Sequence, residues 1–369
     1  MGRYINEQII DDIALGAAVL GTGGGGDPYL GSLMAKHAIR QWGPVNLWDI
    51  NEITDNALFI PSSIIGAPMV AMEKIISPSQ VIRAFEMMEK TLTRSASGTF
   101  PIEVGGINSL IPFILAAKKR IPVVDCDGIG RAFPEVQMVT FYLDEVPSGP
   151  NTIADEKGNT LVLHPIDGVW SERFARVITE QMGASAALCD YPLEGRELKK
   201  SAIPGTLTQA ENIGQTLRLA RQLGNNPIQA IAQALNGHVI ASGKVIDVQR
   251  QTSGGFTRGN VVIEGMRDEK GELVNILFQN ELLLAYRSST TREPTPENLL
   301  AVVPDLISIL DSETGQPIVT EYLRYGQRVV VMASPCHTKW RSARGLAVAG
   351  PRYFGYPIDY VAIEQLANR

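Results

Sequence analysis

The stretch TFPIEVGGINSLIPFILAAKKRIPVVDCDG, residues 99–128, decides the fold. An apolar strand is expected over 99–106, a helix over 108–120 and a second apolar strand over 121–128. The helix has a proline in its first turn and basic residues at its C-terminal end. A strand, a helix and a strand this close together predict a βαβ unit with two parallel, neighbouring strands.

The flanking sequence predicts helices on the N-terminal side and strands on the C-terminal side. Apolar residues at helical spacing predict helices over 5–20 and 28–42, the second with Asp27 as cap and Pro28 as first residue. Between the βαβ unit and residue 190 we expect a strand, a hairpin and a helix, over 136–143, 151–164 and 171–189. From His238 onward, short β-branched runs separated by turn residues predict a β-rich region.

These elements predict an α+β fold with two domains. Residues 1–190 form an N-terminal α/β domain with the parallel βαβ unit, and residues 191–369 form a C-terminal β-rich domain preceded by helices. The first of these helices is expected over 210–224, with Thr208 and Glu211 as a capping box. A chain of 369 residues exceeds the usual size of one compact core, which agrees with two domains.

Composition excludes several classes of partner. The formal net charge is −6 and there is no run of Lys and Arg, so we expect no nucleic-acid partner. The N-terminal segment carries charges where a signal peptide needs an apolar core, and no apolar run reaches membrane-spanning length, so no membrane role is expected. Three cysteines are too few for a disulfide scaffold and favour a reducing, cytoplasmic location.

Four consecutive glycines, Gly23, Gly24, Gly25 and Gly26, lie between the first two predicted helices. Neither a preceding strand nor a following Gly-Lys-Ser/Thr is present, so no nucleotide motif is recognised. One interpretation is a crowded turn between helices. The other is a substrate-binding loop whose backbone N–H groups face a polar ligand, with at least one positive φ.

Polar residues are dense where the two strands of the βαβ unit end. Ligands of parallel α/β units bind at the carboxyl ends of the strands. We therefore expect Glu103 and Asn108 to converge with Asp125 and Asp127 on one cleft, with Arg131 nearby. In this hypothesis Glu103, Asn108 and Arg131 bind substrate.

The Asp-Cys-Asp triplet supplies the predicted catalytic residues Asp125, Cys126 and Asp127. Alternation along a strand places the two carboxylates on one face and the thiol on the other. The carboxylates are expected to move protons or hold a divalent metal, and their charge raises the pKa of the thiol. The alternative is that Asp125 and Asp127 are turn and cap residues and that Cys126 is packed in the core.

Two further motifs have structural alternatives. Cys336 and His337 are adjacent, so they share a site only if they lie in a loop. The Gly-Gly segment at 251–260 is interpreted as a hairpin connection. The four histidines have no zinc-binding spacing, and the metal and cofactor remain unknown, with a divalent metal as the candidate.

The stretches DDIALGAAVLGTGGGGDPYLG and PIEVGGINSLIPFILAAKKRIPVVDCDGIGRAFPEVQM resemble a bacterial and fungal family described as S-methyl-thiohydantoin desulfurase-like. The resemblance covers nearly the whole chain, and in some proteins this domain is fused to hydantoinase/oxoprolinase A-type subunits. It implies a hydantoinase-like or thiohydantoin-desulfurase-like enzyme, of hydrolase or lyase type, acting on a small cyclic amide or related five-membered heterocycle. The alternative is a non-catalytic subunit, or a metabolite-binding partner, of a hydantoinase-type enzyme. A homo-oligomer or such a partner subunit is expected as the assembly.

Overall fold

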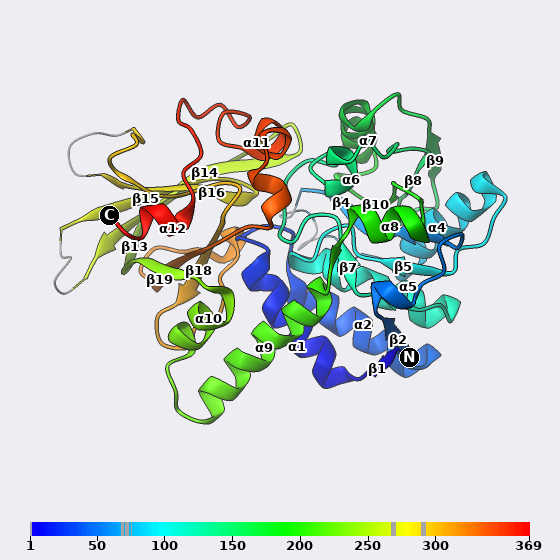
Figure 1. Ribbon diagram of the computed structural model, residues 1–369, viewed down its shortest axis with the longest axis horizontal. Coiled ribbons are helices and arrows are strands. Elements are labelled where there is room, and N and C mark those ends of the chain that lie inside the picture. The colour runs from blue at the N-terminus through cyan, green and yellow to red at the C-terminus, as the bar shows by residue number, and fades with distance from the viewer. Residues whose placement is uncertain (1, 68–69, 71–73, 75, 267–270, 289–292) are drawn as a thin grey trace.

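The computed structural model describes residues 2–67, 70, 74, 76–266, 271–288 and 293–369. It has an N-terminal region of mixed helices and strands and a C-terminal region built on one antiparallel sheet (Figure 1). This arrangement confirms the α+β expectation. No helix among the described residues has the length and apolar content that crossing a bilayer requires.

A six-stranded sheet forms the centre of the N-terminal region, in the order β1-β2-β6-β5-β3-β11. Its inner strands β2, β6, β5 and β3 are parallel, and the outer strands β1 and β11 are antiparallel to their neighbours. The strand bounds are β1 Arg3–Ile5, β2 Val45–Trp48, β3 Leu58–Pro61, β5 Gly98–Phe100, β6 Val123–Val124 and β11 Leu193–Glu194.

The predicted βαβ unit is present, with parallel pairing between Thr99 of β5 and Val123 of β6. Helix α5, Ile111–Lys119, connects them after a short 3₁₀ turn, Gly106–Ser109. Both strands are shorter than predicted. Pro101 lacks the N–H needed to continue β5. After Val124 the chain changes partners, and β7, Cys126–Asp127, pairs with β12, Ile203–Pro204, in a separate two-stranded sheet.

A second N-terminal sheet has the antiparallel order β4-β10-β8-β9. The predicted hairpin is confirmed as β8 and β9, Asn151–Ala154 and Thr160–Leu163. The predicted helix 171–189 is only partly correct, because α7, Gly168–Gln181, ends before Gly183 and Ala184, which have left-handed φ values of 87° and 61°. The chain then forms β10, Ser185–Cys189, which pairs with β4, Ser63–Gly66.

Residues 136–143 form no strand, although one was predicted there. Their last four residues are the short helix α6, Thr140–Leu143. An apolar run of this length does not distinguish a buried strand from a buried helical turn by periodicity alone.

Helices pack beside these sheets and between the two regions (Figure 1). α1, Glu7–Leu20, and α9, Thr206–Gln222, lie side by side, and Gly16 and Gly214 allow their backbones to approach. The predicted cap at Asp27 is confirmed, because its carboxylate accepts the Tyr29 N–H at 2.8 Å. The other helices are α2 Pro28–Trp42, α4 Pro78–Leu92, α8 Gly195–Ser201, α10 Pro227–Leu235, α11 Ala343–Ala349 and α12 Ile363–Leu366.

The C-terminal sheet has seven strands in the antiparallel order β17-β16-β15-β14-β13-β19-β18. It curls enough for β16 to contact β18. The expected Gly-Gly hairpin is confirmed, with Gly254 and Gly255 at positive φ between β13 and β14. The strand bounds are β13 His238–Ser253, β14 Phe256–Gly265, β15 Leu273–Gln279, β16 Glu281–Ser288, β17 Leu299–Val302, β18 Leu306–Asp311 and β19 Arg328–Ser334.

Candidate functional site

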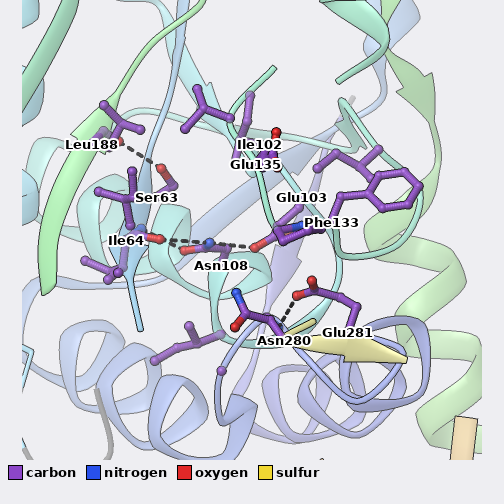
Figure 2. Close-up of a pocket in the computed structure, with 18 of the residues that line it drawn as sticks. Ser63, Ile64, Ile102, Glu103, Asn108, Phe133, Glu135, Leu188, Asn280 and Glu281 are labelled. Atoms are coloured by element: carbon purple, nitrogen blue, oxygen red, sulfur yellow. Dashed lines mark hydrogen bonds between the residues drawn. The ribbon is translucent and has the colours of Figure 1, made fainter. Parts of the chain in front are cut away.

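A cavity lies where the N-terminal region meets the β15–β16 hairpin of the C-terminal sheet (Figure 2). It contains about 790 Å³ of empty space, counted out to its mouth. Its wall combines the glycine loop, strand β4 and the segments that follow β5, β7 and β10. The residues that carry polar side chains in this wall are Ser63, Glu103, Asn108, Glu135, Arg176, Ser185, Asp190, Asn280 and Glu281.

The glycine loop forms part of this wall, as predicted. Gly23, Gly25 and Gly26 have positive φ, and Gly25 and Gly26 line the cavity. The Gly25 carbonyl accepts the Ile107 N–H at 2.9 Å, and a Cβ on Gly25 would lie 2.6 Å from the Gly105 carbonyl oxygen. The loop therefore needs glycine at position 25 because another backbone segment lies against it.

The N–H group of Gly25 does not face a free space for a ligand. It donates to Oε1 of Glu281 at 3.2 Å, while the Gly24 N–H donates to the Gly21 carbonyl at 2.9 Å. A Cβ on Gly24 would lie 2.2 Å from Oε1 of the same Glu281. Gly24 thus leaves room for the Glu281 carboxyl, and Gly25 holds it by a hydrogen bond.

Glu103 and Asn108 lie together in the cavity wall, as predicted (Figure 2). Nδ2 of Asn108 donates to Oε1 of Glu103 at 2.7 Å, and Oδ1 of Asn108 accepts the Ile64 N–H at 2.8 Å. Asn108 is therefore held by β4 and presents its amide to one oxygen of Glu103. Oε2 of Glu103 is buried and has no hydrogen-bond partner.

Burial raises the pKa of Glu103 to about 8, although the hydrogen bond from Asn108 opposes this shift. The carboxyl is consequently mostly neutral at pH 7. A protonated carboxyl has one O–H donor beside its remaining acceptor capacity.

Glu281 is the principal site residue that the sequence analysis missed. It begins β16 immediately after Asn280, which has a φ of 58° in the tight turn from β15. Oε2 of Glu281 is buried and unpartnered. Burial raises the pKa of Glu281 well above its usual value, and the nearby Glu103 carboxyl raises it further, while Arg131 opposes the shift. The polar break QNE at 279–281, inside a long apolar run, was the available signal.

Asp190 supplies a third buried carboxyl, from the segment that follows β10. Its Oδ2 has no hydrogen-bond partner. Burial raises the pKa of Asp190 to about 7, and its own backbone N–H lowers it in part. Neither Asp190 nor β10 was predicted at the site, because the region was assigned to a helix.

The predicted catalytic residue Asp125 does not line the cavity with Glu103 and Asn108. Its carboxylate accepts the N–H groups of Leu207 and Thr208 at 2.9 and 3.1 Å, and the hydroxyl of Thr208 as well. Asp125 thus caps the first turn of α9 from a distant part of the chain. The predicted capping box is wrong, because Thr208 and Glu211 lie inside a helix that starts at Thr206.

Asp127 and Cys126 are not among the residues that line the cavity. Asp127 accepts the Val104 and Gly130 N–H groups at 2.8 Å each, so its carboxyl fixes the backbone that carries Glu103. Cys126 is fully buried, and burial together with both flanking aspartates raises the pKa of its thiol. The alternative interpretation of this triplet, as turn, cap and core residues, matches these contacts. A role of the triplet in turnover stays a prediction.

Arg131 does not line the cavity either, although it was predicted to bind substrate. Its guanidinium is fully buried and donates to the carbonyls of Pro304 and Asp305 at 2.7 and 3.0 Å and to the hydroxyl of Thr22 at 2.9 Å. With these donors engaged, Arg131 ties the glycine loop to the C-terminal sheet. Gly23 has a similar role, because its carbonyl accepts the Thr320 N–H at 2.7 Å.

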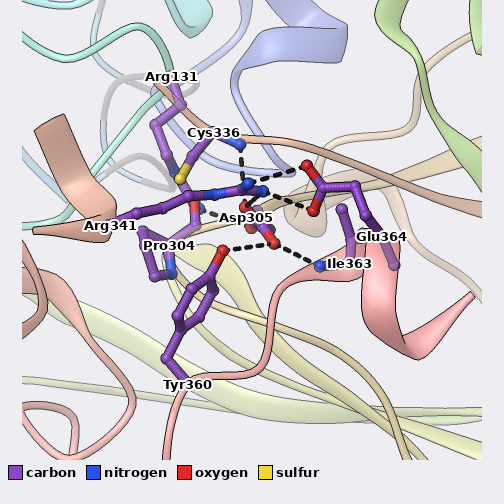
Figure 3. A network of polar contacts seen from close by, with 8 residues as sticks. All are labelled: Arg131, Pro304, Asp305, Cys336, Arg341, Tyr360, Ile363 and Glu364. Carbon is purple, nitrogen blue, oxygen red and sulfur yellow. Dashed lines mark hydrogen bonds and ion pairs between the residues drawn. The ribbon is translucent and has the colours of Figure 1, made fainter. Parts of the chain in front are cut away.

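Cys336 belongs to a polar network around buried Asp305 (Figure 3). The Asp305 carboxylate accepts the Cys336 N–H at 3.0 Å and pairs with Arg341 at 2.8 Å. Nδ1 of His337 caps the following 3₁₀ turn by accepting the Lys339 N–H at 3.4 Å. The two residues therefore do not share a site with each other or with the cavity.

The comparisons with known proteins cover both regions of the chain. Residues 8–165 match the family described as "S-Me-THD-like, N-terminal domain" and residues 166–363 match "S-Me-THD-like, C-terminal domain". The chain belongs to the S-Me-THD-like family. This assignment confirms the resemblance that the sequence showed, at the level of the family.

A crystal structure of a protein from Chromobacterium violaceum has the same fold as this S-Me-THD-like chain. The TM-score is 0.80 at 23% identity, and the alignment covers 98% of this chain and 100% of that one. No curated protein matches the chain. The structural likeness therefore supports the architecture, and the chemistry has to be argued from the cavity.

In the cavity of this S-Me-THD-like chain, Glu103 and Glu281 form a pair, and the other carboxyl groups are single. Among the described residues, no group of three or more His, Cys, Asp or Glu side chains is arranged to hold a metal ion. A divalent metal therefore stays a prediction from the sequence. The described side chains themselves offer acid and base groups.

Proposed function

We propose that this protein is a hydantoinase-like or thiohydantoin-desulfurase-like enzyme that acts on a small five-membered cyclic amide or related heterocycle. One observation carries the proposal. Glu103 and Glu281 each have one carboxyl oxygen held by a hydrogen bond and the other buried and unpartnered in the same cavity. The family assignment supports this substrate class, and the cavity has groups that suit it.

A neutral carboxyl is complementary to the edge of a cyclic amide. The ring locks its amide in the cis form, which places an N–H donor and a carbonyl or thiocarbonyl acceptor side by side. A protonated carboxyl also offers a donor and an acceptor side by side. Gly25, Gly26 and strand β4 also line this cavity.

The environments of Glu103 and Glu281 differ, and this difference is the basis for assigning one as acid and the other as base. Burial raises the pKa of both carboxyls, and the nearby Glu103 carboxyl raises the pKa of Glu281 further. In such a pair the group with the lower pKa acts as base and the other as acid. We assign the ionised form of Glu103 as the base that activates water and the neutral form of Glu281 as the acid that protonates the leaving group.

For an S-methylated thiohydantoin the step is a hydrolysis. Glu103 removes a proton from water while the water oxygen bonds to the ring carbon that carries sulfur. The carbon–sulfur bond then breaks, Glu281 protonates the departing sulfur, and methanethiol leaves. The hydroxyl proton on the ring carbon moves to the neighbouring ring nitrogen, so the carbon keeps the oxygen as a carbonyl. The proton held by Glu103 returns to Glu281 through solvent, which completes the balance.

The test uses the purified full chain and a panel of S-methyl-thiohydantoin, 2-thiohydantoin and hydantoin. Released thiol is measured with a chromogenic thiol reagent, and ring opening by ultraviolet absorbance. We expect turnover of at least one ring by the unaltered protein, and loss of that turnover in Glu103→Gln and Glu281→Gln. Glu86→Gln, an exposed change on α4, is the control. Tight binding of a ring without turnover would instead support a non-catalytic, metabolite-binding role.

We also propose a cytoplasmic location. The three cysteines are all free and buried. A free-thiol protein suits a reducing compartment.

A further inference from the structure

We propose that Asn280 is a further catalytic residue of the cavity, and that its side-chain amide stabilises the negative charge that develops on the ring when water adds to it. The inference rests on the proposed function, because it takes the addition of water to a ring carbon as the reaction. The group that Asn280 contacts is the nitrogen, oxygen or sulfur atom doubly bonded to that carbon.

The addition of water creates a charge that neither the acid nor the base stabilises. As the water oxygen bonds to the ring carbon, the water proton moves to the ionised Glu103. The electron pair of the carbon–heteroatom double bond moves onto the heteroatom, which is a ring nitrogen in the S-methylated ring. When the carbon–sulfur bond breaks, the double bond forms again and Glu281 protonates the sulfur. A donor beside the heteroatom stabilises the charged state more than the neutral ring and thus accelerates the step.

Neighbouring donors in the cavity wall are already engaged. Nδ2 of Asn108 donates to Oε1 of Glu103 at 2.7 Å and to the Ile64 carbonyl at 3.2 Å. The Gly25 N–H donates to Oε1 of Glu281 at 3.2 Å. Each of these groups would have to give up a hydrogen bond within the protein before it could donate to the ring.

The hydrogen bonds of Asn280 leave its side-chain nitrogen for a ligand. Its backbone N–H donates to the Thr257 carbonyl at 2.7 Å, and its carbonyl accepts the Thr320 hydroxyl at 3.1 Å. Its side-chain oxygen Oδ1 accepts the Thr257 N–H at 2.9 Å, so the other side-chain atom is Nδ2 with its two donors. No described residue accepts a hydrogen bond from Nδ2.

The burial and the backbone of Asn280 fix where this amide lies. The residue is 4% exposed, lines the cavity and has a φ of 58° in the turn between β15 and β16. Asparagine adopts this left-handed conformation more readily than most residues with a side chain. Figure 2 shows the Asn280 amide below Asn108 and Glu103, with its nitrogen on the side that faces them. A donor held in place and away from bulk water needs no rearrangement at the moment of reaction.

Asn280 also directly precedes the proposed acid in the chain. Asn280 and Glu281 are neighbours in the polar break QNE at 279–281, and both line the cavity. Since Gly25 holds Oε1 of Glu281, the unpartnered Oε2 of Glu281 and Nδ2 of Asn280 remain for the ligand. The same turn thus supplies a proton donor for the leaving group and a neutral hydrogen-bond donor for the developing charge.

The first experiment measures kcat and KM of Asn280→Gly on the ring that the unaltered protein turns over fastest. Glycine keeps the left-handed backbone and removes both side-chain donors. We expect kcat to fall by about 100-fold or more, the scale for loss of one such donor, and KM to change by less than about threefold. Asn236→Gly is the matched control, since Asn236 is exposed at the end of α10 with a φ of 49°, and it should keep the original kcat.

Asn280→Asp separates a catalytic role from a structural one. The aspartate keeps the acceptor for the Thr257 N–H, and it has an O–H donor only when it is protonated. The ratio of its kcat to that of the unaltered protein should therefore rise by about 10-fold or more as the pH falls from about 8 to about 6. A low ratio that does not change with pH would mean that the side chain only supports the turn.

A crystal structure of the unaltered protein with bound hydantoin tests the contact without any variant. Nδ2 of Asn280 should lie within about 3.2 Å of a ring oxygen or nitrogen. A ring bound in the cavity beyond the reach of Nδ2 would overturn the inference, even where Asn280→Gly fails to fold.

The outcomes separate this inference from the proposed function. Turnover by the unaltered protein, with kcat retained by folded Asn280→Gly, overturns the role of Asn280 and leaves the enzyme assignment standing. Absence of turnover of every ring by the unaltered protein overturns the enzyme assignment and the catalytic role of Asn280 with it. A slow Asn280→Gly with unchanged KM, together with the pH-dependent ratio of Asn280→Asp, supports both.

Discussion

Two acidic segments follow neighbouring parallel strands of this protein, and only one of them lines the cavity. In the segment after β6, the carboxylates of Asp125 and Asp127 are engaged by N–H groups from α9 and from the chain after β5 and β7. In the segment after β5, Glu103 receives one hydrogen bond from Asn108 and keeps a buried oxygen unpartnered. The comparison shows that a buried carboxyl oxygen without a hydrogen-bond partner distinguishes the cavity segment from the other one. The number of acidic residues does not distinguish them.

The largest effect is expected when the two proposed proton-transfer groups are removed. Glu103→Gln and Glu281→Gln should each lower kcat by about 100-fold or more, the usual scale of general acid–base catalysis. Glutamine keeps the shape and the hydrogen bonds to Asn108 or Gly25, so binding of the ring should change little. Steady-state kinetics on the panel above checks the split between kcat and KM. A full-rate Glu103→Gln would remove Glu103 from the chemistry.

Because these acids are buried, the free energy of unfolding should fall as the pH rises. Glu103 keeps its proton when folded up to a pKa of about 8, but loses it near 4.5 when unfolded. Between these values the folded state binds more protons, so stability falls with increasing pH, by at most about 1.4 kcal/mol per pH unit. Glu103→Gln should therefore gain stability over the unaltered protein as the pH rises from 5 to 8.

Denaturant unfolding at each half pH unit measures this gain. Asp359→Asn, whose carboxylate is exposed, is the control and should show no such trend. A gain that shrinks as the pH rises would mean that Glu103 is ionised throughout in the folded protein.

Substitutions in the glycine loop test whether the loop contributes to ring binding or is only a turn. Gly25→Val combines a positive φ with a Cβ 2.6 Å from the Gly105 carbonyl oxygen, and Gly43→Val has a positive φ but nothing within 4 Å of its Cβ. Both should lose about 1–3 kcal/mol of stability from backbone strain. Only Gly25→Val should also weaken ring binding, by about 10-fold, because it shifts the N–H that holds Glu281. Equal binding by the two folded variants would make the loop a simple turn.

The smallest effect on turnover is expected at Asp125, whose carboxylate already accepts hydrogen bonds from α9. Asp125→Ala removes the acceptor for the first turn of α9 and should cost about 1–2 kcal/mol of stability, as loss of a helix cap does. Thermal unfolding measures this loss, and turnover of the folded variant should stay within about twofold of the unaltered protein. A 100-fold loss of turnover at unchanged stability would restore Asp125 to the catalytic group predicted from the sequence.

Local patterns predicted the parts of the fold that depend on near neighbours. The Asp27 cap and the βαβ unit were of this kind, and so were Glu103 and Asn108, which follow one strand within a few residues. Glu281 could not be placed, because it reaches Gly25 across 256 positions of sequence through the β15–β16 turn. Asp125 was misjudged for a related reason, since its partner helix starts about 80 residues later and the triplet alone does not reveal it.

The division of the cavity wall between distant parts of the chain has a consequence for synthesis. The ribosome releases the glycine loop and Glu103 long before it releases Glu281, and the N-terminal region alone has an open wall where that carboxyl belongs. In the proposed mechanism, a truncated or half-made chain would thus hold Glu103 without Glu281. The proposed hydrolysis would therefore require that translation has passed β16 and that the last sheet has docked.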